Sequence, residues 1–198
     1  MLVLYLYYNK SGEEIEVKKI LVLTGSPRKN GNSDLLAEAF IEGARQAGHE
    51  TAKFKAGLKQ IQGCMACKAC WSKDRACVIK DGFTELEPML EAADMIVFAT
   101  PLYWFGMPAQ LKAAIDRFYA YKSDACRRPL KASECVLLAC GNDEGPEIFD
   151  GLIASYKSMA NYLDCKDRGI IAVNGVDSIG DIKNTDALER AKKLGKSI

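Results

Sequence analysis

Short, continuous apolar runs alternate with longer amphipathic stretches along this chain, and this alternation constrains the fold more than any other feature. Because the runs lack the polar–apolar alternation of a strand with one face in water, each predicts a strand buried on both faces. Strands are expected at 19–24, 51–56, 95–100, 135–140 and 169–173, and helices at 34–47, 84–93, 108–119, 148–163 and 187–194. Such an alternation, with right-handed crossovers, predicts a five-stranded, doubly wound parallel α/β sheet with helices on both faces.

Several details of these elements follow from local chemistry. Pro88 has no backbone N–H, so we expect it in the first turn of its helix. Tyr119 is spaced to face the core from the helix over 108–119. The single histidine, His49, is expected to be a turn residue or a partner of a helix C-terminus. Asp116 and Arg117 are expected to be surface or interface charges.

Length and composition set the domain organisation. The 198 residues suit one domain, which we assign to residues 18–198, preceded by an N-terminal β extension over 1–17. The sequence Asn9–Gly12 predicts a turn, so 2–8 and 14–17 are expected to form a hairpin or an added edge strand. The net charge of +1 argues against nucleic-acid binding. No apolar run reaches ~18 residues and no signal peptide is evident, so we expect no membrane helix and a cytoplasmic location.

The segment 25–33, GSPRKNGNS, follows the first buried strand and precedes a helix. Its glycines permit a sharp turn and a close backbone approach, Ser26 and Ser33 offer hydroxyls, and Arg28 offers a planar cation. A helix N-terminus also favours an anion. Because neither nucleotide-binding pattern, GxxxxGK[ST] or GxGxxG, is present, we predict a site for a phosphate monoester without Mg²⁺. The alternative is that Ser33 or Asn32 only caps the helix while Arg28 is solvated.

A second segment, 100–106, leaves the carboxyl end of another buried strand, where open α/β sheets place their ligands. Its sequence, TPLYWFG, supplies aromatic faces and backbone amides that suit a flat ring system. Three adjacent aromatic residues cannot all face one core, so some are exposed or contact a ligand. The alternative is that they belong to the core or to a dimer interface. The loop 140–145, which contains Gly141, leaves the next strand and is placed to reach the other side of that ring.

Four of the eight cysteines crowd into the loop 63–78 with the spacing C-x2-C-x2-C-x6-C. In a reducing compartment such a cluster indicates metal or redox chemistry. Three cysteines spaced by two residues suit three corners of an iron–sulfur cube, with the fourth corner left to a later cysteine. A structural zinc ion normally takes two C-x2-C pairs separated by a longer loop. We favour one 4Fe-4S cluster; zinc and metal-free redox-active thiols are the alternatives. The predicted ligands are Cys64, Cys67, Cys70 and Cys77.

The nonamer at 25–33 and the later segment TPLYWFGMPAQLKAAIDRF resemble the flavodoxin-like NAD(P)H-dependent FMN reductases, over about residues 18–194. The cysteine spacing is similar to that of the iron–sulfur flavoproteins, a branch of the same group. The resemblance implies FMN, a cluster on the four cysteines, and a sheet with strand order 2-1-3-4-5. It implies that the FMN phosphate is held by Ser26, Arg28, Asn32 and Ser33 and that the ring lies beside Pro101, Leu102, Tyr103, Trp104 and Phe105.

These assignments predict an FMN-dependent oxidoreductase that passes electrons from NAD(P)H or ferredoxin to a small-molecule or protein acceptor. We call residues 25–33 the phosphate loop and residues 63–78 the cysteine loop. In the order 2-1-3-4-5 these two loops leave neighbouring strands at the same edge of the sheet. The alternatives are an FMN or quinone reductase without a cluster, a non-enzymatic electron carrier, and a cysteine-based sensor without flavin. No catalytic side chain is assigned, because the flavin would do the chemistry. Exposed aromatic residues and the apolar extension predict a homodimer or homotetramer.

Overall fold

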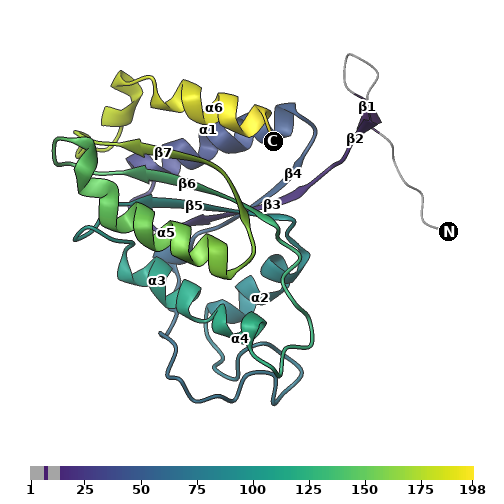
Figure 1. Cartoon of the computed structure of the whole chain (residues 1–198). Coiled ribbons are helices and arrows are strands. Elements are labelled where there is room, and N and C mark those ends of the chain that lie inside the picture. Colours follow the sequence, from purple (N-terminus) through teal and green to yellow (C-terminus); the bar gives the residue numbers. More distant parts are fainter. Residues whose placement is uncertain (1–6, 9–13) are drawn as a thin grey trace.

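The computed structural model describes residues 7–8 and 14–198. Its centre is a five-stranded parallel sheet (Figure 1) in the order β4-β3-β5-β6-β7. In chain order this is 2-1-3-4-5, so the predicted flavodoxin-like sheet is confirmed. The strands are β3 (Lys19–Thr24), β4 (Glu50–Phe54), β5 (Met95–Pro101), β6 (Glu134–Cys140) and β7 (Lys166–Val173).

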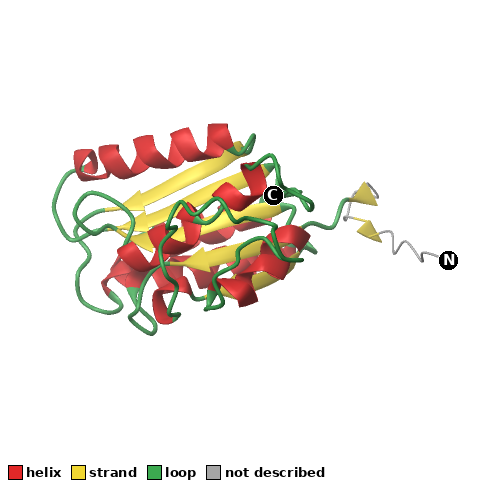
Figure 2. Cartoon of the chain, turned by 90° about the horizontal axis from the view of Figure 1, so that it is seen from below, coloured by secondary structure: helices red, strands yellow, loops and turns green. Residues whose placement is uncertain are grey.

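Helices cover both faces of the sheet, as Figures 1 and 2 show. Helices α1 (Asn32–Gln46) and α6 (Ala187–Lys196) lie on one face. The other face is covered by α2 (Phe83–Ala92), α3 (Ala109–Asp116), α4 (Tyr119–Lys122) and α5 (Asp150–Tyr162). Short 3-10 turns are η1 (Ala56–Leu58), η2 (Pro146–Phe149) and η3 (Asp181–Asn184).

Strand residues alternate between the two faces, as a strand period of two requires. In β3, Ile20 and Val22 pack with α1 and α6, whereas Leu21 and Leu23 pack with α2, α3 and α5. All four are buried. Apolar side chains on both faces explain why this strand is a continuous apolar run in the sequence.

The described part of the N-terminal extension forms a small separate sheet. Strand β1 (Tyr7–Tyr8) pairs antiparallel with β2 (Glu14–Ile15), and the pair lies outside the main sheet. Figures 1 and 2 show it projecting from the body of the molecule. Antiparallel pairing of β1 with β2 is what the hairpin alternative requires, and the predicted turn and residues 2–6 lie outside the described residues. Of the helices in the described part, none is long and apolar enough to span a bilayer.

Two local predictions are wrong and a third is right in only one of its alternatives. Pro88 is not in the first turn but is the sixth residue of α2. Its missing N–H leaves the Thr84 carbonyl without a helical partner, and this is tolerated because Thr84 is exposed to water. Tyr119 does not face the core: 3-10 hydrogen bonds tighten the end of α3, α4 begins at Tyr119, and the residue is 47% exposed.

The third concerns His49, which follows the turn and whose backbone N–H donates to the Ala44 carbonyl in the last turn of α1 at 3.1 Å, so it is a partner of a helix C-terminus through its backbone. The turn is made by Gly48, whose φ of 93° favours glycine. His49 is buried, and its Nδ1 accepts the backbone N–H of Lys18 at 3.3 Å. Burial, and then the nearby Lys18 charge, lower the pKa of this imidazole. It therefore joins the start of β3 to the start of β4.

Candidate functional site

Four loops meet at the carboxyl edge of the sheet and enclose a cleft. They follow β3, β5, β6 and β7, and the first three are the loops that carry the predicted cofactor residues. Of those predicted residues, Trp104 and Phe105 do not line the cleft, and the other eight do. The structure adds Val176 and Asp177 after β7, which the sequence did not single out. The lining residues are Ser26, Arg28, Gly31, Asn32, Ser33, Pro101, Leu102, Tyr103, Cys140, Gly141, Asn142, Val176 and Asp177.

The start of α1 presents unpaired backbone donors to this cleft. The helix begins at Asn32 after Gly31, and among the described residues no side chain caps it. The alternative that Ser33 or Asn32 caps the helix is therefore wrong. The first N–H groups of a helix have no acceptor within it, so they and the helix dipole are available to an anion. The hydroxyl-bearing residues Ser26 and Ser33 are 8% and 1% exposed, so they lie at the bottom of the loop.

The Asn32 side chain is engaged elsewhere. Its Nδ2 donates to the Ser178 carbonyl at 3.0 Å, and its Oδ1 accepts the N–H groups of Gly180 at 3.0 Å and Ile182 at 3.3 Å. These bonds fasten the loop after β7 to the start of α1. Asn32 therefore has its backbone N–H, not its side chain, to offer a ligand.

Arg28 joins the loop after β3 to the loop after β7. Its Nη1 donates to the Asp177 carbonyl at 2.9 Å, and its side chain is 53% exposed. The remaining guanidinium donors are thus open to solvent or a ligand at the mouth of the cleft. Cys140 also lines the cleft, where burial raises the pKa of its thiol to about 12. At neutral pH this thiol is uncharged.

Gly57, in η1, packs directly against the backbone of the phosphate loop at Gly25 and Ser26. The sequence did not single it out. A Cβ atom there would lie 2.5 Å from the carbonyl carbon and oxygen of Ser26. Only glycine permits this approach of the two backbones. Its neighbours in sequence carry no turn or ligand pattern, so nothing in the sequence distinguished it from other glycines.

The aromatic residues after β5 form a tight turn that projects from the body. Tyr103 and Gly106 exchange two backbone hydrogen bonds of 3.0 Å, while Trp104 and Phe105 take left-handed φ values of 47° and 60°. Tyr103, Trp104 and Phe105 are 40%, 96% and 58% exposed, so none is a core residue. Non-glycine residues in this conformation cost energy and are enriched at functional sites. The turn offers flat apolar faces next to the cleft.

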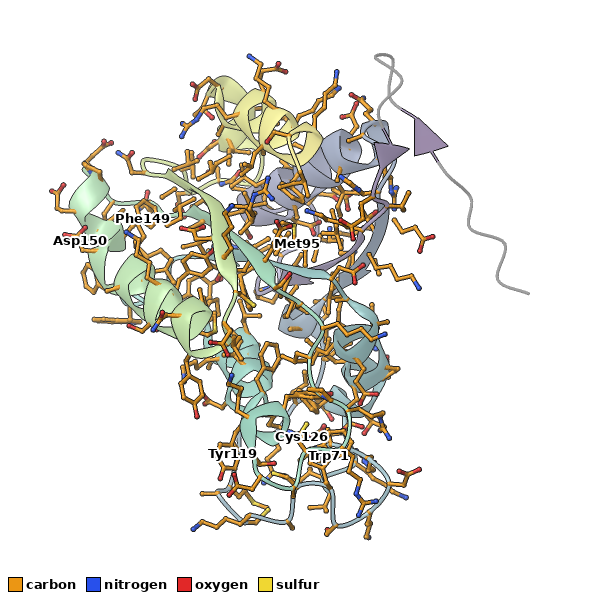
Figure 3. All side chains as sticks on the ribbon, turned by 45° about the vertical axis from the view of Figure 1, so that its right-hand side comes forward. Trp71, Met95, Tyr119, Cys126, Phe149 and Asp150 are labelled. Carbon is orange, nitrogen blue, oxygen red and sulfur yellow. The ribbon has the colours of Figure 1, made fainter. Side chains whose placement is uncertain are left out.

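The cysteine loop 63–78 is fastened by buried side chains instead of by strands or helices. Trp71, within the loop, is 1% exposed, donates from Nε1 to the Ala120 carbonyl at 2.8 Å and packs edge-on against Tyr121. The Cys77 N–H donates to Oε1 of the buried Glu87 at 2.9 Å. Figure 3 shows Trp71, Tyr119 and Cys126 together at one end of the molecule, away from Phe149.

All four predicted cysteine ligands line one small cavity, together with residues 117, 119 and 120 after α3. Cys64 and Cys67 are exposed, Cys70 is half-buried and Cys77 is buried. Burial, and then the charges of the other three cysteines, raise the pKa of Cys70. Ala66 and Lys68, between the cysteines, have left-handed φ values of 53° and 54°. In the part of the chain that the structure describes, no three His, Cys, Asp or Glu side chains converge closely enough to hold a single metal ion.

The two candidate sites lie toward opposite ends of α3. The cleft uses residues 101–103, before this helix, whereas the cysteine cavity uses residues 117–120, after it, and no described residue lines both. An eight-residue helix is about 12 Å long. The cysteine loop does leave the same sheet edge as the phosphate loop, but its cysteines lie farther along α3.

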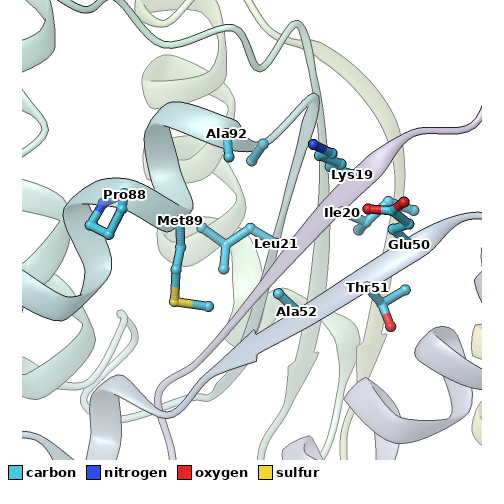
Figure 4. Close-up of a pocket in the computed structure, with 10 residues that line it drawn as sticks. Lys19, Ile20, Leu21, Glu50, Thr51, Ala52, Pro88, Met89 and Ala92 are labelled. Atoms are coloured by element: carbon cyan, nitrogen blue, oxygen red, sulfur yellow. The ribbon is translucent and has the colours of Figure 1, made fainter. Parts of the chain in front are cut away.

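A third cavity, of about 330 Å³, lies at the amino ends of β3 and β4 beside α2 (Figure 4). Its lining is mainly apolar, with Lys19 and Glu50 at the strand starts. Because parallel sheets place ligands at the carboxyl ends of strands, this cavity is at the wrong edge for the predicted cofactor.

One sequence interpretation of a charged pair is half wrong. Asp116 is exposed, as expected, but Arg117 is 2% exposed and forms an ion pair with Asp81 at 2.7 Å. Burial alone would raise the pKa of Asp81, but the N–H groups of Gln62 and Phe83 and the Arg117 guanidinium together lower it. A buried guanidinium needs such a partner, and sequence spacing along α3 did not reveal one.

Comparison with known proteins identifies the group to which this cleft belongs. The sequence pattern of the family described as NADPH-dependent FMN reductase matches residues 18–145, more than half of the chain. The chain belongs to this family. As an FMN reductase family member it is an FMN-dependent oxidoreductase with a nicotinamide donor, and the resemblance inferred from its motifs is confirmed.

Relatives and solved structures agree with this assignment. An iron-sulfur flavoprotein of Archaeoglobus fulgidus is 29% identical over 185 residues, which cover 91% of this chain and 78% of the relative. Another, of Methanosarcina thermophila, is 40% identical over 99 residues, which cover 50% of this chain and 51% of the relative. The solved NAD(P)H:quinone oxidoreductase of Methanothermobacter marburgensis has a TM-score of 0.74 at 19% identity, covering 92% of this chain and 96% of that one, and shows the shared fold.

Proposed function

We propose that FMN binds in the cleft with its phosphate at the start of α1. The free N–H groups of α1, the Ser26 and Ser33 hydroxyls and the exposed donors of Arg28 together form an anion site. Asn32 contributes its backbone N–H. Pro101, Leu102 and Tyr103 border the ring on one side and Gly141 borders it on the other. Trp104 and Phe105, on the turn next to the cleft, extend the first side beyond the cleft lining. The exposure of the aromatic turn supports this arrangement, because a core role would have buried it.

We further propose that Cys64, Cys67, Cys70 and Cys77 hold a 4Fe-4S cluster. The observation that carries this proposal is that all four thiols of one short loop line a single cavity. Ala66 and Lys68, which lie between these cysteines, have left-handed φ values, so the backbone turns within each pair of residues that separates two cysteines. The relatives described as iron-sulfur flavoproteins support the same assignment.

The resulting function is transfer of electrons from NAD(P)H or ferredoxin to a quinone-like or protein acceptor. When bound, FMN supplies hydride acceptance and one-electron release, and the cluster supplies one-electron transfer. The chain itself binds and orients these groups. The 96% exposed Trp104 lies on a turn beside the cleft, which supports a homodimer or homotetramer with the turn at a subunit contact. A single monomeric species in sedimentation at micromolar concentration would contradict this oligomer.

Iron and acid-labile sulfide analysis of anaerobically purified protein tests the cluster. We expect four irons and four sulfides per chain in the wild type, as a 4Fe-4S cluster requires, and loss of both in Cys70→Ser. Cys126→Ser is the matched control, because Cys126 is also partly buried but lies outside the loop. Stoichiometric zinc, or no metal with the four thiols titratable, would replace the cluster assignment by one of its alternatives.

The flavin assignment has its own test. We expect FMN absorbance in the purified or reconstituted protein, with steady-state oxidation of NADH or NADPH. Retention of FMN by Cys70→Ser would show that the two sites load separately. FMN binding without oxidation of either nicotinamide would favour an electron carrier, and absence of FMN binding would favour the sensor.

A further inference from the structure

Arg117 is a buried cation that the proposed function does not use. It caps the C-terminal end of α3, with its side chain 1% exposed, and its Nη1 bonds Oδ2 of Asp81 at 2.7 Å. The guanidinium also lies over the Phe83 ring, 4.4 Å from its centre. Burial of a charge at this depth is costly, so a specific role is expected for it.

The same guanidinium bonds the chain on both sides of the cysteine loop. Nη1 donates to the Gln62 carbonyl at 3.2 Å and Nη2 donates to the Ile79 carbonyl at 3.0 Å. Gln62 lies two residues before Cys64, and Ile79 lies two residues after Cys77. Asp81 completes the closure, because its Oδ2 accepts the Gln62 N–H at 2.9 Å. One arginine and one carboxylate therefore join the entry of the loop to its exit.

Arg117 also lines the cavity that the four cysteines share. Its Nε is buried and, within residues 7–8 and 14–198, has no hydrogen-bond partner. Buried donors are rarely left unpaired, and such a group calls for an explanation. A ligand in the cysteine cavity would provide one.

Arginine suits this position better than lysine. Its planar group carries five donors in fixed directions, so one side chain can bond a carboxylate and two carbonyls and still have a donor left. A lysine could pair with Asp81 but could not hold both carbonyls in one plane. Arg75 donates to the same Ile79 carbonyl at 2.9 Å, so of the two carbonyls that Arg117 bonds, only that of Gln62 has no second arginine donor.

We propose that Arg117 is the positioning residue of the cysteine loop: it holds the two ends of the loop together and presents Nε–H as a donor to the sulfur-containing group bound by the cysteines. This inference rests on the cluster assignment above. Residues behind a metal's ligands commonly change metal affinity by about 10–100-fold when they are removed.

The test compares anaerobic wild type with Arg117→Lys and with the double variant Arg117→Gln/Asp81→Asn, which leaves no unpaired charge. We expect a chelator to remove iron about tenfold faster from the double variant. We also expect the midpoint potential of the remaining cluster to become more negative, because hydrogen bonds to sulfur raise cluster potentials. Arg117→Lys should match the wild type neither in its rate of iron release nor in its cluster potential. Unchanged FMN content confirms that each variant is folded.

Lys112→Gln is the matched control, since Lys112 forms an exposed pair with Asp116 on the same helix and should leave both readouts unchanged. The inference would be overturned if the double variant released iron at the wild-type rate and had the wild-type potential. It would also be overturned if Arg117→Lys matched the wild type in both properties. Wild type without iron would instead refute the cluster. In that case alkylation decides: buried Cys77 should react with iodoacetamide faster in the double variant, and equal rates in the two proteins would overturn the loop closure.

Discussion

The cleft and the cysteine cavity are built from different parts of the chain. The cleft lies where regular elements end, and its anion site consists largely of backbone N–H groups at the start of α1. The cysteine cavity lies in a loop with no helix or strand over 63–78, which is held by the side chains of Trp71, Glu87 and Arg117. A site made of backbone depends on the fold as a whole, whereas a site made in a loop depends on a few buried side chains.

The largest expected effect comes from the two tryptophans, one in each region. Trp71→Ala removes a 1% exposed side chain and should destabilise the protein by about 3–5 kcal/mol, with loss of iron. Trp104→Ala, at 96% exposed in the single chain, should change the stability of the monomeric chain without FMN by less than about 0.5 kcal/mol. Urea unfolding of both variants measures the difference. Similar costs for the two substitutions would remove the distinction between a side-chain-built loop and an exposed turn.

A pair of glycines tests the backbone-built region. Gly57→Ala places a methyl group 2.5 Å from the Ser26 carbonyl, and such overpacking costs about 1–3 kcal/mol. We expect FMN affinity, measured by fluorescence titration, to fall about tenfold or more as the phosphate loop shifts. Gly63→Ala is the control, because a Cβ atom there meets nothing within 4 Å. FMN binding by Gly57→Ala at wild-type affinity would mean that the loop adapts freely.

Substitution of Asn32 distinguishes a side chain that binds the ligand from one that only holds the loops of the cleft together. Asn32→Ala leaves the N–H groups of Gly180 and Ile182 without their acceptor, which should cost about 1–3 kcal/mol of stability. FMN affinity should change less than about threefold, because the backbone N–H is retained. Calorimetric unfolding with and without FMN measures both. A large loss of affinity at unchanged stability would instead favour a side-chain contact with the phosphate.

The sequence predicted the strands that carry a repeated apolar pattern. It missed the roles of residues whose contacts lie far away along the chain. The apolar runs predicted the central strands β3, β5 and β6, since burial on both faces leaves a clear pattern. The order of the five strands came from the family resemblance. Arg117 was misassigned because its partners, Asp81, Gln62 and Ile79, lie 36 to 55 residues away. Gly57 was missed for the same reason: its closeness to Ser26 arises from the packing of η1 against the loop after β3.

The smallest expected effect concerns the acid sensitivity of the cysteine region. The pKa of Asp81 is lower in the folded protein than its usual value, because hydrogen bonds from Gln62 and Phe83 and the charge of Arg117 outweigh its burial. Such a carboxyl adds stability above its unfolded pKa of about 4, and this contribution is lost as pH falls through the lower folded value. Wild-type stability should therefore fall more steeply below about pH 4 than that of Asp81→Asn.

Urea unfolding of wild type and Asp81→Asn between about pH 6 and pH 2.5 measures this difference. Burial would raise the pKa of Glu134, but its hydrogen bonds and ion pairs with Lys18 and Arg168 lower it. Because Glu134 is present in both proteins, its contribution cancels in the comparison. Glu134 lies at the start of β6, in the sheet and not in the cysteine loop. Parallel pH profiles for the two proteins would mean that the closure of the cysteine loop does not depend on the Asp81 charge, and would leave the carbonyl contacts of Arg117 as its basis.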